Sequence, residues 1–518
     1  MQDDLIAAVD CGTQSVRLLL FDRLGNLQAL EKVEIEPYFS ERPGWAEQDP
    51  SVYENAIAKA CRKLKDRDEG AWKRVRGVVL ATQRDTCVVV GKNGTVVRPA
   101  IVWLDQRMAR SPRKIPFIYR VGFRIVGMHE AARISQKKSK AYWMKENEPE
   151  NWKNTRKFLL LSGWLHYRLT GRMADSVANQ IGHIPFNYKI QAWPRSRYDY
   201  RWYVFGVDRE KLPELVEPAD VIGNITPEGA ELTGLPPGVP VFAGGSDKGC
   251  ETLAAGCLDP SSACVSLGTT ATLQVMSPRY LEPIKFMPSY PAVIPGFFNP
   301  EVEIFRGFWM VTWFKREFGA YEVNVARERG VPVEDVLNEL LESTPPGSMG
   351  LMLQPYWGAG LKMPEARGSI VGFGDVHSRA HVYRAIVEGI SYALRDAAEK
   401  VERVSRVPIK SVVASGGGSR SDLVCQVLAD VMGRPVLRTH TFEGSGLGAA
   451  IVGFCALGVY RTFREAVENM VRHTRRFEPD PERADLYAEL YNRVYRRLYS
   501  RLKPLYEEMR RITGYPEY

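Results

Sequence analysis

The stretch "AAVDCGTQSVRLLLFD", residues 7–22, decides the fold because it predicts two apolar strands joined by a tight turn. Three residues of different chemistry, Asp10, Gly12 and Thr13, interrupt the apolar pattern around the turn. A turn that carries glycine and threonine exposes backbone N–H groups and a hydroxyl, which are ligands for phosphate. A carboxylate beside phosphate indicates a bridging cation, since Mg²⁺ prefers one or two carboxylates with water and phosphate oxygens. For this turn taken alone, an ordinary β-hairpin is the alternative interpretation.

A second stretch, "ACVSLGTTATLQV" at residues 263–275, repeats this pattern. The two stretches share a valine, a glycine and a threonine at matching positions: Val9, Gly12 and Thr13 in the first, and Val265, Gly268 and Thr269 in the second. Because each lies near the start of one half of the chain, we infer an internal duplication of a whole domain. Two such turns, with Asp10 and Arg17 beside the first, would hold one nucleoside triphosphate across a cleft.

Alternating strands and helices surround both turns. In the first half, strands are predicted at 4–10, 16–22, 27–36 and 75–83, and a helix at 49–66. In the second half, strands are predicted at 261–268, 270–277, 409–418 and 434–439, and helices at 379–404, 421–433 and 446–458. Three antiparallel strands followed by a helix and a further strand indicate a mixed sheet with helices packed on it, which is an α/β architecture.

Domain boundaries follow from the duplication. We expect an N-terminal domain at 1–246, a C-terminal domain at 247–461 and a helical C-terminal extension at 462–518. A chain of 518 residues exceeds the size of one ordinary core, which agrees with this division.

Composition narrows the class of protein. No run of about 18 apolar residues occurs, so no membrane partner is expected. The eight cysteines form no CxxC pair, which predicts reduced thiols in a cytoplasmic protein. The net charge of +9 is compatible with nucleic-acid binding, but no nucleic-acid module is present, and solvated basic faces are the favoured interpretation. A homodimer or higher homo-oligomer is left open.

The familiar nucleotide motifs are missing from the sequence. It contains no GxxxxGK[ST] loop and no HRD or DFG set, which excludes P-loop proteins and protein kinases. The segment "GSGLGA" at 444–449 fits GxGxxA, but no strand leads directly into it. A close-packed glycine helix is therefore predicted there.

Asp247 is the candidate catalytic base. It follows a predicted strand and two glycines in "AGGSDKGCETLAAG", at the proposed domain boundary. A carboxylate in that place would take a proton from an alcohol, and phosphoryl transfer otherwise needs mainly positioning and charge neutralisation. The alternative is that Asp247 is the N-cap of the next helix.

Candidate acceptor contacts lie after the strand at 75–83. Arg84 and Asp85 in "LATQRDTCVVV" would hydrogen-bond several hydroxyls of a polyol, and Trp103 in "AIVWLDQRMA" would pack against its carbons. The alternatives are a surface ion pair between Arg84 and Asp85, and a tryptophan in the core.

Seven segments in the same order resemble the FGGY carbohydrate kinases, a family that includes glycerol kinase, xylulokinase and ribulokinase. The segments are "DCGTQSVR", "GWAEQDP", "TQRDT", "AIVWLDQR", "AGGSDKG", "SLGTTA" and "GGGSRSDLVCQVLADVMGRPV". The resemblance covers most of the chain except its C-terminal end. It implies two ribonuclease-H-like domains, as in actin and hexokinase, that close on ATP and substrate.

The resemblance also implies roles for individual residues. Asp10 would help to hold Mg²⁺, and Asp247 would be the catalytic base. The phosphate-binding residues would be Gly12, Thr13, Arg17, Gly268 and Thr269. The nucleotide-binding residues would be Gly416, Gly417 and Ser421. The substrate-binding residues would be Arg84, Asp85, Trp103 and Asp247.

The implied activity is transfer of a phosphoryl group from ATP to an alcohol group of a small polyol or sugar. The segments around Arg84 and Trp103 look like the substrate site of glycerol kinase, whereas the second domain looks closer to the sugar kinases. Three residues depart from glycerol kinase, because Asp85 replaces a glutamate, Ser135 a tyrosine and Lys248 a glutamine. A ketopentose kinase is therefore an alternative. A non-catalytic ATP-binding or sugar-sensing module of the actin or chaperone type is an alternative of another class.

Overall fold

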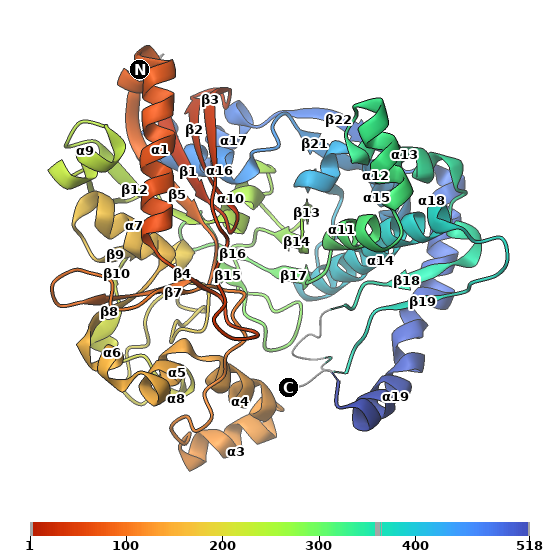
Figure 1. Ribbon diagram of the computed structural model, residues 1–518, viewed down its shortest axis with the longest axis horizontal. Helices are drawn as coiled ribbons and strands as arrows, with labels where there is room; N and C mark the ends of the chain where they lie inside the picture. The colour runs from red at the N-terminus through yellow and green to blue at the C-terminus, as the bar shows by residue number, and fades with distance from the viewer. Residues whose placement is uncertain (1–3, 358–362, 364, 516–518) are drawn as a thin grey trace.

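Two six-stranded mixed sheets lie side by side, one in each half of the computed structural model (Figure 1). The structure describes residues 4–357, 363 and 365–515. The N-terminal sheet contains β1 (Leu5–Cys11), β2 (Ser15–Asp22), β3 (Leu27–Glu34), β5 (Val75–Thr82), β11 (Val221–Asn224) and β12 (Pro240–Ser246). The C-terminal sheet contains β13 (Ser262–Leu267), β14 (Ala271–Val275), β17 (Glu301–Ile304), β20 (Ser411–Ser415), β21 (Val436–Thr439) and β22 (His473–Phe477).

The two sheets repeat one topology over five strands. The order β3-β2-β1-β5-β12 in the first matches β17-β14-β13-β20-β21 in the second. In both, the first three strands pair antiparallel and the next two join in parallel. The sixth strands differ, because β11 precedes its neighbour β12 in the chain, whereas β22 follows its neighbour β21. The predicted strand–turn–strand repeat is therefore one part of a larger repeat.

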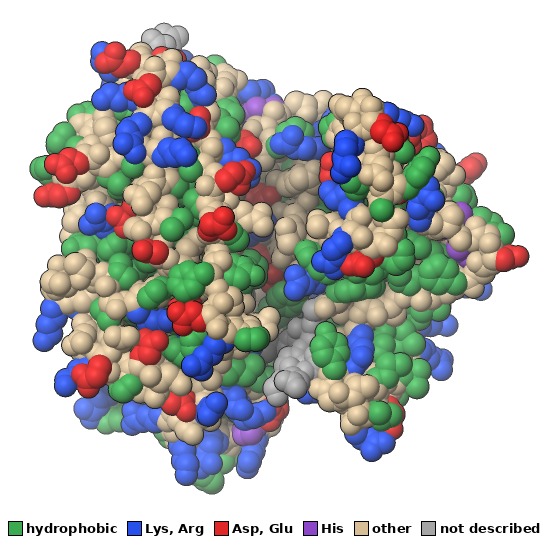
Figure 2. Space-filling view, in the orientation of Figure 1, with side chains coloured by type: hydrophobic (Ala, Val, Ile, Leu, Met, Phe, Trp, Pro, Cys, Tyr) green, Lys and Arg blue, Asp and Glu red, His purple; other side chains and the backbone are tan. Residues whose placement is uncertain are grey.

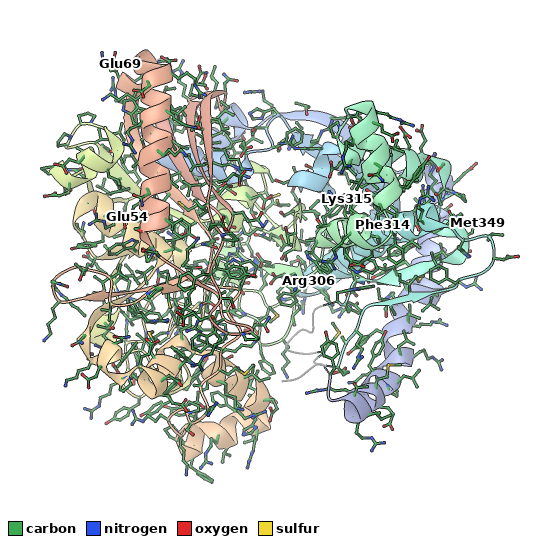
Figure 3. All side chains as sticks on the ribbon, in the orientation of Figure 1. Glu54, Glu69, Arg306, Phe314, Lys315 and Met349 are labelled. Atoms are coloured by element: carbon green, nitrogen blue, oxygen red, sulfur yellow. The ribbon has the colours of Figure 1, made fainter. Side chains whose placement is uncertain are left out.

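Helices cover the N-terminal sheet on both faces. One face packs against α1 (Ser51–Arg67), α7 (Leu161–Thr170) and α9 (Pro227–Thr233). Glu54, labelled on α1 in Figure 3, accepts hydrogen bonds from Trp164 Nε1 at 2.9 Å and Arg168 Nε at 2.7 Å, which ties α1 to α7. The other face packs against α10 (Asp247–Ala254), α16 (Gly444–Ala456) and α17 (Phe463–Met470).

Close packing explains the glycines of α16. A Cβ on Gly448 would lie 2.0 Å from the carbonyl oxygen of Cys250, and one on Gly446 would lie 2.9 Å from the side chain of Leu19. A side chain at either place would push α16 away from α10 or from β2. The predicted glycine helix is confirmed, and α16 links the C-terminal half of the chain to the N-terminal sheet.

The C-terminal sheet has its largest core on the face away from α10. The helices that contribute to this core are α11 (Trp309–Glu317), α13 (Val333–Ser343), α14 (Arg379–Ser405), α15 (Asp422–Met432) and α18 (Pro481–Leu490). Beside α11 and α13 lies α12 (Ala320–Arg329). Tyr487, Tyr491 and Tyr495 bury their rings against α14, which anchors the C-terminal helices.

The predicted helical extension at 462–518 also contains a strand. After α17 the chain forms β22, which pairs antiparallel with β21 at the edge of the C-terminal sheet. Its sequence, "HTRRF", is charged and mostly exposed, so it lacks the alternating apolar pattern of a half-buried strand. Then follow α18, a π-helical turn at Tyr491–Tyr495 and α19 (Arg496–Thr513).

A smaller sheet is formed by three strands of the insert between β5 and β12, together with β4, which precedes β5 in the chain. Its order is β4-β7-β6-β8, with β4 at Glu47–Gln48, β6 at Cys87–Gly91, β7 at Ala100–Ile101 and β8 at Thr155–Leu160. Short helices lie around it at the lower left of Figure 1, among them α3 (Phe117–Ile125), α4 (His129–Lys138), α5 (Lys140–Asn147), α6 (Pro149–Asn154) and α8 (Tyr200–Phe205). This insert carries the candidate acceptor contacts.

Two sequence expectations concern the thiols and the membrane. All eight cysteines are free, and seven of them are buried. Within residues 4–357, 363 and 365–515, none of the helices combines the length and the apolar character needed to cross a membrane.

Candidate active site

The first phosphate turn lies between β1 and β2, and its geometry is fixed by hydrogen bonds. Gly12 N donates to Ser15 O at 3.0 Å. The Thr13 hydroxyl donates to Gln83 Oε1 at 3.0 Å and accepts from Trp103 Nε1 at 2.9 Å. The Gly12 N–H and the Thr13 hydroxyl are therefore already engaged within the protein, so the other backbone N–H groups of this turn are better ligands for an anion.

Asp10 and Arg17 form an ion pair directly behind this turn. They are register partners on β1 and β2, with Arg17 Nη1 3.1 Å from Asp10 Oδ2. Arg17 Nε also lies 3.7 Å from Glu443 Oε2, at the start of α16. Burial raises the pKa of Asp10 to about 7, with the charges of Asp247 and Glu443 adding to the rise and Arg17 opposing it. A cation at Asp10 would relieve this repulsion.

The second phosphate turn lies between β13 and β14. The carbonyls of Gly268 and Thr269 accept hydrogen bonds from the backbone of Phe308 at 2.9 Å and Trp309 at 3.2 Å. Gly416 lies against this turn with φ of 79°, and a Cβ there would meet the Leu267 backbone at 3.1 Å.

The other predicted nucleotide residues follow Gly416 along the chain. A Cβ on Gly417 would meet no atom within 4 Å, so this glycine borders open space. Ser421 is the N-cap of α15, where its hydroxyl accepts from Val424 N at 3.2 Å and donates to Asn338 Oδ1 at 2.6 Å. The structure therefore brings the glycines to the second turn and gives the Ser421 side chain a capping contact.

Asp247 is the first residue of α10, at the carboxyl end of β12. The alternative interpretation as N-cap is wrong, because Ser246 holds that position and accepts from Gly249 N at 3.1 Å. One oxygen of Asp247 accepts from Lys248 N at 2.8 Å, and the other has no hydrogen bond to the described residues. The charge of Asp247 raises the pKa of both Asp10 and Arg84. Asp247 therefore lies between the first phosphate turn and the candidate acceptor contacts.

Lys248 joins the helix of Asp247 to the second turn. Its Nζ donates to Ser266 Oγ at 2.6 Å, one residue before Leu267, and to Glu251 Oε2 at 2.9 Å. Burial alone would lower the pKa of Lys248, but Glu251 and Asp247 outweigh it and raise that pKa. Lys248 is therefore a partly buried, charged link between α10 and β13.

Arg84 spans the two halves of the molecule. Both oxygens of Glu301, on β17, accept from Arg84 Nη1 at 2.9 Å, and the guanidinium lies 4.9 Å from the ring centre of Tyr290. The alternative of an ion pair with Asp85 is wrong. Two buried nitrogens of Arg84, Nε and Nη2, have no partner among the described residues. A buried N–H without a partner is costly, which makes this guanidinium a candidate donor to a ligand oxygen.

Asp85 faces a different set of partners from Arg84. Its Oδ1 accepts from His183 N at 3.0 Å and lies 3.0 Å from Lys140 Nζ, while Oδ2 lies 2.8 Å from His183 Nδ1. Burial would raise the pKa of Asp85, but Lys140 and His183 outweigh it and hold that pKa well below its usual range. The backbone of Asp85 is left-handed, with φ of 52°, and its side chain and that of Arg84 bond to different partners.

Trp103 follows β7 and lies beside the first turn. Its side chain is 39% exposed, which rules out the alternative of a core tryptophan. The hydrogen bond from Nε1 to Thr13 holds the ring at the junction of the acceptor side and the phosphate side. Figure 2 shows a hollow between the two halves of the molecule in this view.

The sequence motifs did not point to Glu301, Tyr290, Lys140 or His183. These residues come from segments outside the seven motifs, and each meets the site only through the tertiary fold. His183 was one of seven scattered histidines, without a neighbour of ligand type at metal-binding spacing.

The described residues do not form a metal site from protein ligands alone. None of them makes a group of three or more His, Cys, Asp or Glu side chains able to hold a metal. Mg²⁺ with a nucleotide needs only one or two carboxylates, because phosphate oxygens and water complete its shell. The electrostatic repulsion between Asp10 and Asp247 fits such a cation.

Comparison with known proteins shows the family to which these features correspond. A model of the FGGY family of carbohydrate kinases, N-terminal domain, matches residues 5–254, and one of its C-terminal domain matches residues 263–457. A xylulose kinase of Staphylococcus epidermidis is 30% identical, over 94% of this chain and 95% of its own.

Solved structures show the same fold. A xylulose kinase from Rhodospirillum rubrum matches with a TM-score of 0.82 and 24% identity, over 97% of this chain and all of its own. A glycerol kinase from Plasmodium falciparum with ADP matches with a TM-score of 0.75 and 17% identity, over 95% of this chain and 98% of its own. The predicted two-domain architecture of the actin and hexokinase type is confirmed.

Proposed function

Because the chain belongs to the FGGY family of carbohydrate kinases, we propose that it transfers the γ-phosphoryl group of ATP to a hydroxyl of a small polyol or ketose. The observation that carries this proposal is the place of Asp247. Its carboxylate lies between Asp10, behind the first phosphate turn, and Arg84, which has two unpartnered nitrogens. A base in that place reaches both the attacking hydroxyl and the phosphoryl group.

Proton transfer to Asp247 begins the reaction. Its free oxygen accepts the proton of the acceptor hydroxyl while the hydroxyl oxygen forms a bond to the γ-phosphorus. The bond between that phosphorus and the β,γ-bridging oxygen breaks, so that ADP leaves and the phosphate ester remains. Phosphoryl transfer passes through a loose transition state, for which positioning and charge neutralisation matter most.

The two Gly-Thr turns supply the phosphate contacts. The first turn, with Gly12, Thr13 and Arg17, would face one side of the triphosphate, and Gly268 with Thr269 would face the other. Asp10 would hold Mg²⁺, which when bound neutralises phosphate charge. Gly416, Gly417 and Ser421 would border the adenosine. In this arrangement residues 1–246 carry the acceptor and phosphate side, and residues 247–461 carry the nucleotide side.

The acceptor would lie against Arg84 and Trp103. The two free Arg84 nitrogens would donate to acceptor oxygens, and the exposed face of Trp103 would cover its carbons. A relative named xylulose kinase supports a ketopentose as acceptor, whereas Arg84 and Trp103 support a polyol. The deciding experiment measures ADP release with glycerol, erythritol, D-xylulose and D-ribulose. Stimulation by at least one supports the proposal, and no stimulation by any of them overturns it.

Trp103 provides a test of the acceptor side. We expect Trp103→Ala to raise the acceptor KM about tenfold while the ATP KM changes less, because a buried aromatic contact contributes about 1.5 kcal/mol or more. Trp103→Phe keeps the ring but loses the bond to Thr13, so it should have the smaller effect on the acceptor KM. Steady-state kinetics with each substrate varied in turn provides the measurement. A larger effect on the ATP KM would remove Trp103 from the acceptor site.

Asp10 provides a pH test of the phosphate side. A carboxyl with a pKa near 7 is neutral below that pH and charged above it, so its ability to hold a cation falls as the pH falls. We expect kcat/KM for ATP with Mg²⁺ to be level above pH 7 and to fall about tenfold per pH unit below it. Burial also raises the pKa of Glu303 to about 7, so Glu303→Gln is the matched control. Loss of the acidic limb in Glu303→Gln would assign that limb to Glu303 instead.

A further inference from the structure

We propose that His183 contacts a hydroxyl of the acceptor through its Nε2, and that Asp85 acts as a positioning residue that holds this imidazole in place. The inference rests on the proposed kinase function and names a specificity-determining residue within it. It also assigns Asp85 a role other than direct contact with the acceptor.

The carboxylate of Asp85 is already engaged within the protein. His183 contacts both of its oxygens, with the backbone N at 3.0 Å from Oδ1 and Nδ1 at 2.8 Å from Oδ2. Lys140 Nζ adds a third contact at 3.0 Å from Oδ1. A Cβ on Gly182 would lie 2.4 Å from Oδ1, so the glycine allows this close approach. These contacts occupy three of the roughly four lone-pair positions of the carboxylate, which is the arrangement of a group that holds other side chains in place.

The hydrogen bonds show which ring nitrogen of His183 carries the hydrogen. Asp85 is ionised at neutral pH, so its oxygens only accept, and His183 Nδ1 must carry the hydrogen that joins them. Nε2 is then the lone-pair atom of the neutral ring, or a donor if the ring is charged. A sugar or polyol hydroxyl both donates and accepts, so it bonds to Nε2 in either state.

Two tyrosines connect the segment of His183 to Arg84. Gly182 N lies 3.3 Å from the Tyr188 hydroxyl, and the ring centres of Tyr188 and Tyr290 lie 5.8 Å apart. Arg84 lies over that same Tyr290 ring. His183 Nε2 has no partner among the described residues, and the side chain is 32% exposed. His183 therefore lies in the same part of the molecule as Arg84, with Nε2 as its unpartnered ring nitrogen.

Two amide variants separate the proposed role from a purely structural one. Asparagine at position 183 places an amide near Nδ1, so it preserves the bond to Asp85 and removes the group at Nε2. Glutamine places its amide near the position of Nε2, so it preserves a hydrogen-bonding group there and loses the bond to Asp85. Since a hydrogen bond to a neutral group contributes about 0.5–1.5 kcal/mol, we expect His183→Asn to raise the acceptor KM about five- to tenfold. His183→Gln should raise it less, and neither should change the ATP KM.

The test uses the full chain and whichever of glycerol, erythritol, D-xylulose and D-ribulose the wild type phosphorylates best. Thermal unfolding of each variant reports the structural role separately. The reverse order, with His183→Gln more impaired than His183→Asn in acceptor KM, would show that His183 only supports Asp85 and would overturn the inference. Equal acceptor KM values in both variants and the wild type would overturn it as well. If the wild type phosphorylates none of the four, the proposed function itself fails, which is a different result.

A double-mutant cycle tests the role of Asp85. We expect Asp85→Asn to raise the acceptor KM in the wild type but to have little further effect in His183→Asn, because both changes then act on one contact. Fully additive increases in acceptor KM would show that Asp85 meets the acceptor independently, contrary to the inference.

Discussion

We expect the Asp247→Asn variant to phosphorylate its acceptor about a hundredfold more slowly than the wild type, or slower still, because general-base catalysis contributes about 10²–10⁴-fold. An amide does not accept the hydroxyl proton at neutral pH. The fold around the site should be preserved, because Ser246 rather than Asp247 caps α10. The effect should therefore appear in kcat, with acceptor and ATP KM values changed far less.

The measurement is acceptor-dependent ADP release at saturating substrates. Asp66→Asn is a matched control, because it makes the same carboxylate-to-amide change at an exposed position near the end of α1. We expect the control to retain wild-type kcat and both variants to unfold at similar temperatures. Near-wild-type turnover in Asp247→Asn would refute its assignment as the base.

The parts of the site that the sequence predicted are those in which neighbours along the chain act together. A Gly-Thr turn between two strands is local, so its two copies could be recognised and its role proposed before any tertiary contact was known. Asp247 was recognisable for the same reason, since it directly follows a strand. Its assignment as a possible N-cap was wrong because Ser246, one residue earlier, takes that position.

Contacts between distant segments could not be predicted in this way. Arg84 and Asp85 are adjacent, but their side chains bond to partners far apart in the sequence, Glu301 for the first and His183 for the second. Glu301 lies in a later strand of the other half, and His183 lies beyond the inserted sheet. The two-residue strands of that sheet, β4 and β7, are too short for a periodic pattern, so it was not foreseen.

Arg84→Gln should lower both acceptor affinity and stability. Removing the guanidinium leaves the Glu301 carboxylate buried near Glu303 and Asp247, and breaking a buried ion pair from one side costs about 3–5 kcal/mol. It also removes the two free nitrogens that we assign to the acceptor. We expect kcat/KM for the acceptor to fall about a hundredfold, since hydrogen bonds from a charged group contribute about 1.5–3 kcal/mol.

The Arg84→Gln/Glu301→Gln double variant separates these two effects. Neutralising Glu301 removes the uncompensated buried charge, so we expect most of the lost unfolding free energy to return, as measured by urea denaturation. Acceptor kcat/KM should stay low, because the two glutamine side chains do not replace the charged N–H donors that we assign to the acceptor. Glu301→Gln alone provides the reference, since it keeps Arg84 but weakens its anchor across the two halves. Recovery of acceptor kcat/KM together with stability would mean that Arg84 serves only to join the halves, and the contact with the acceptor would then have to come from other residues.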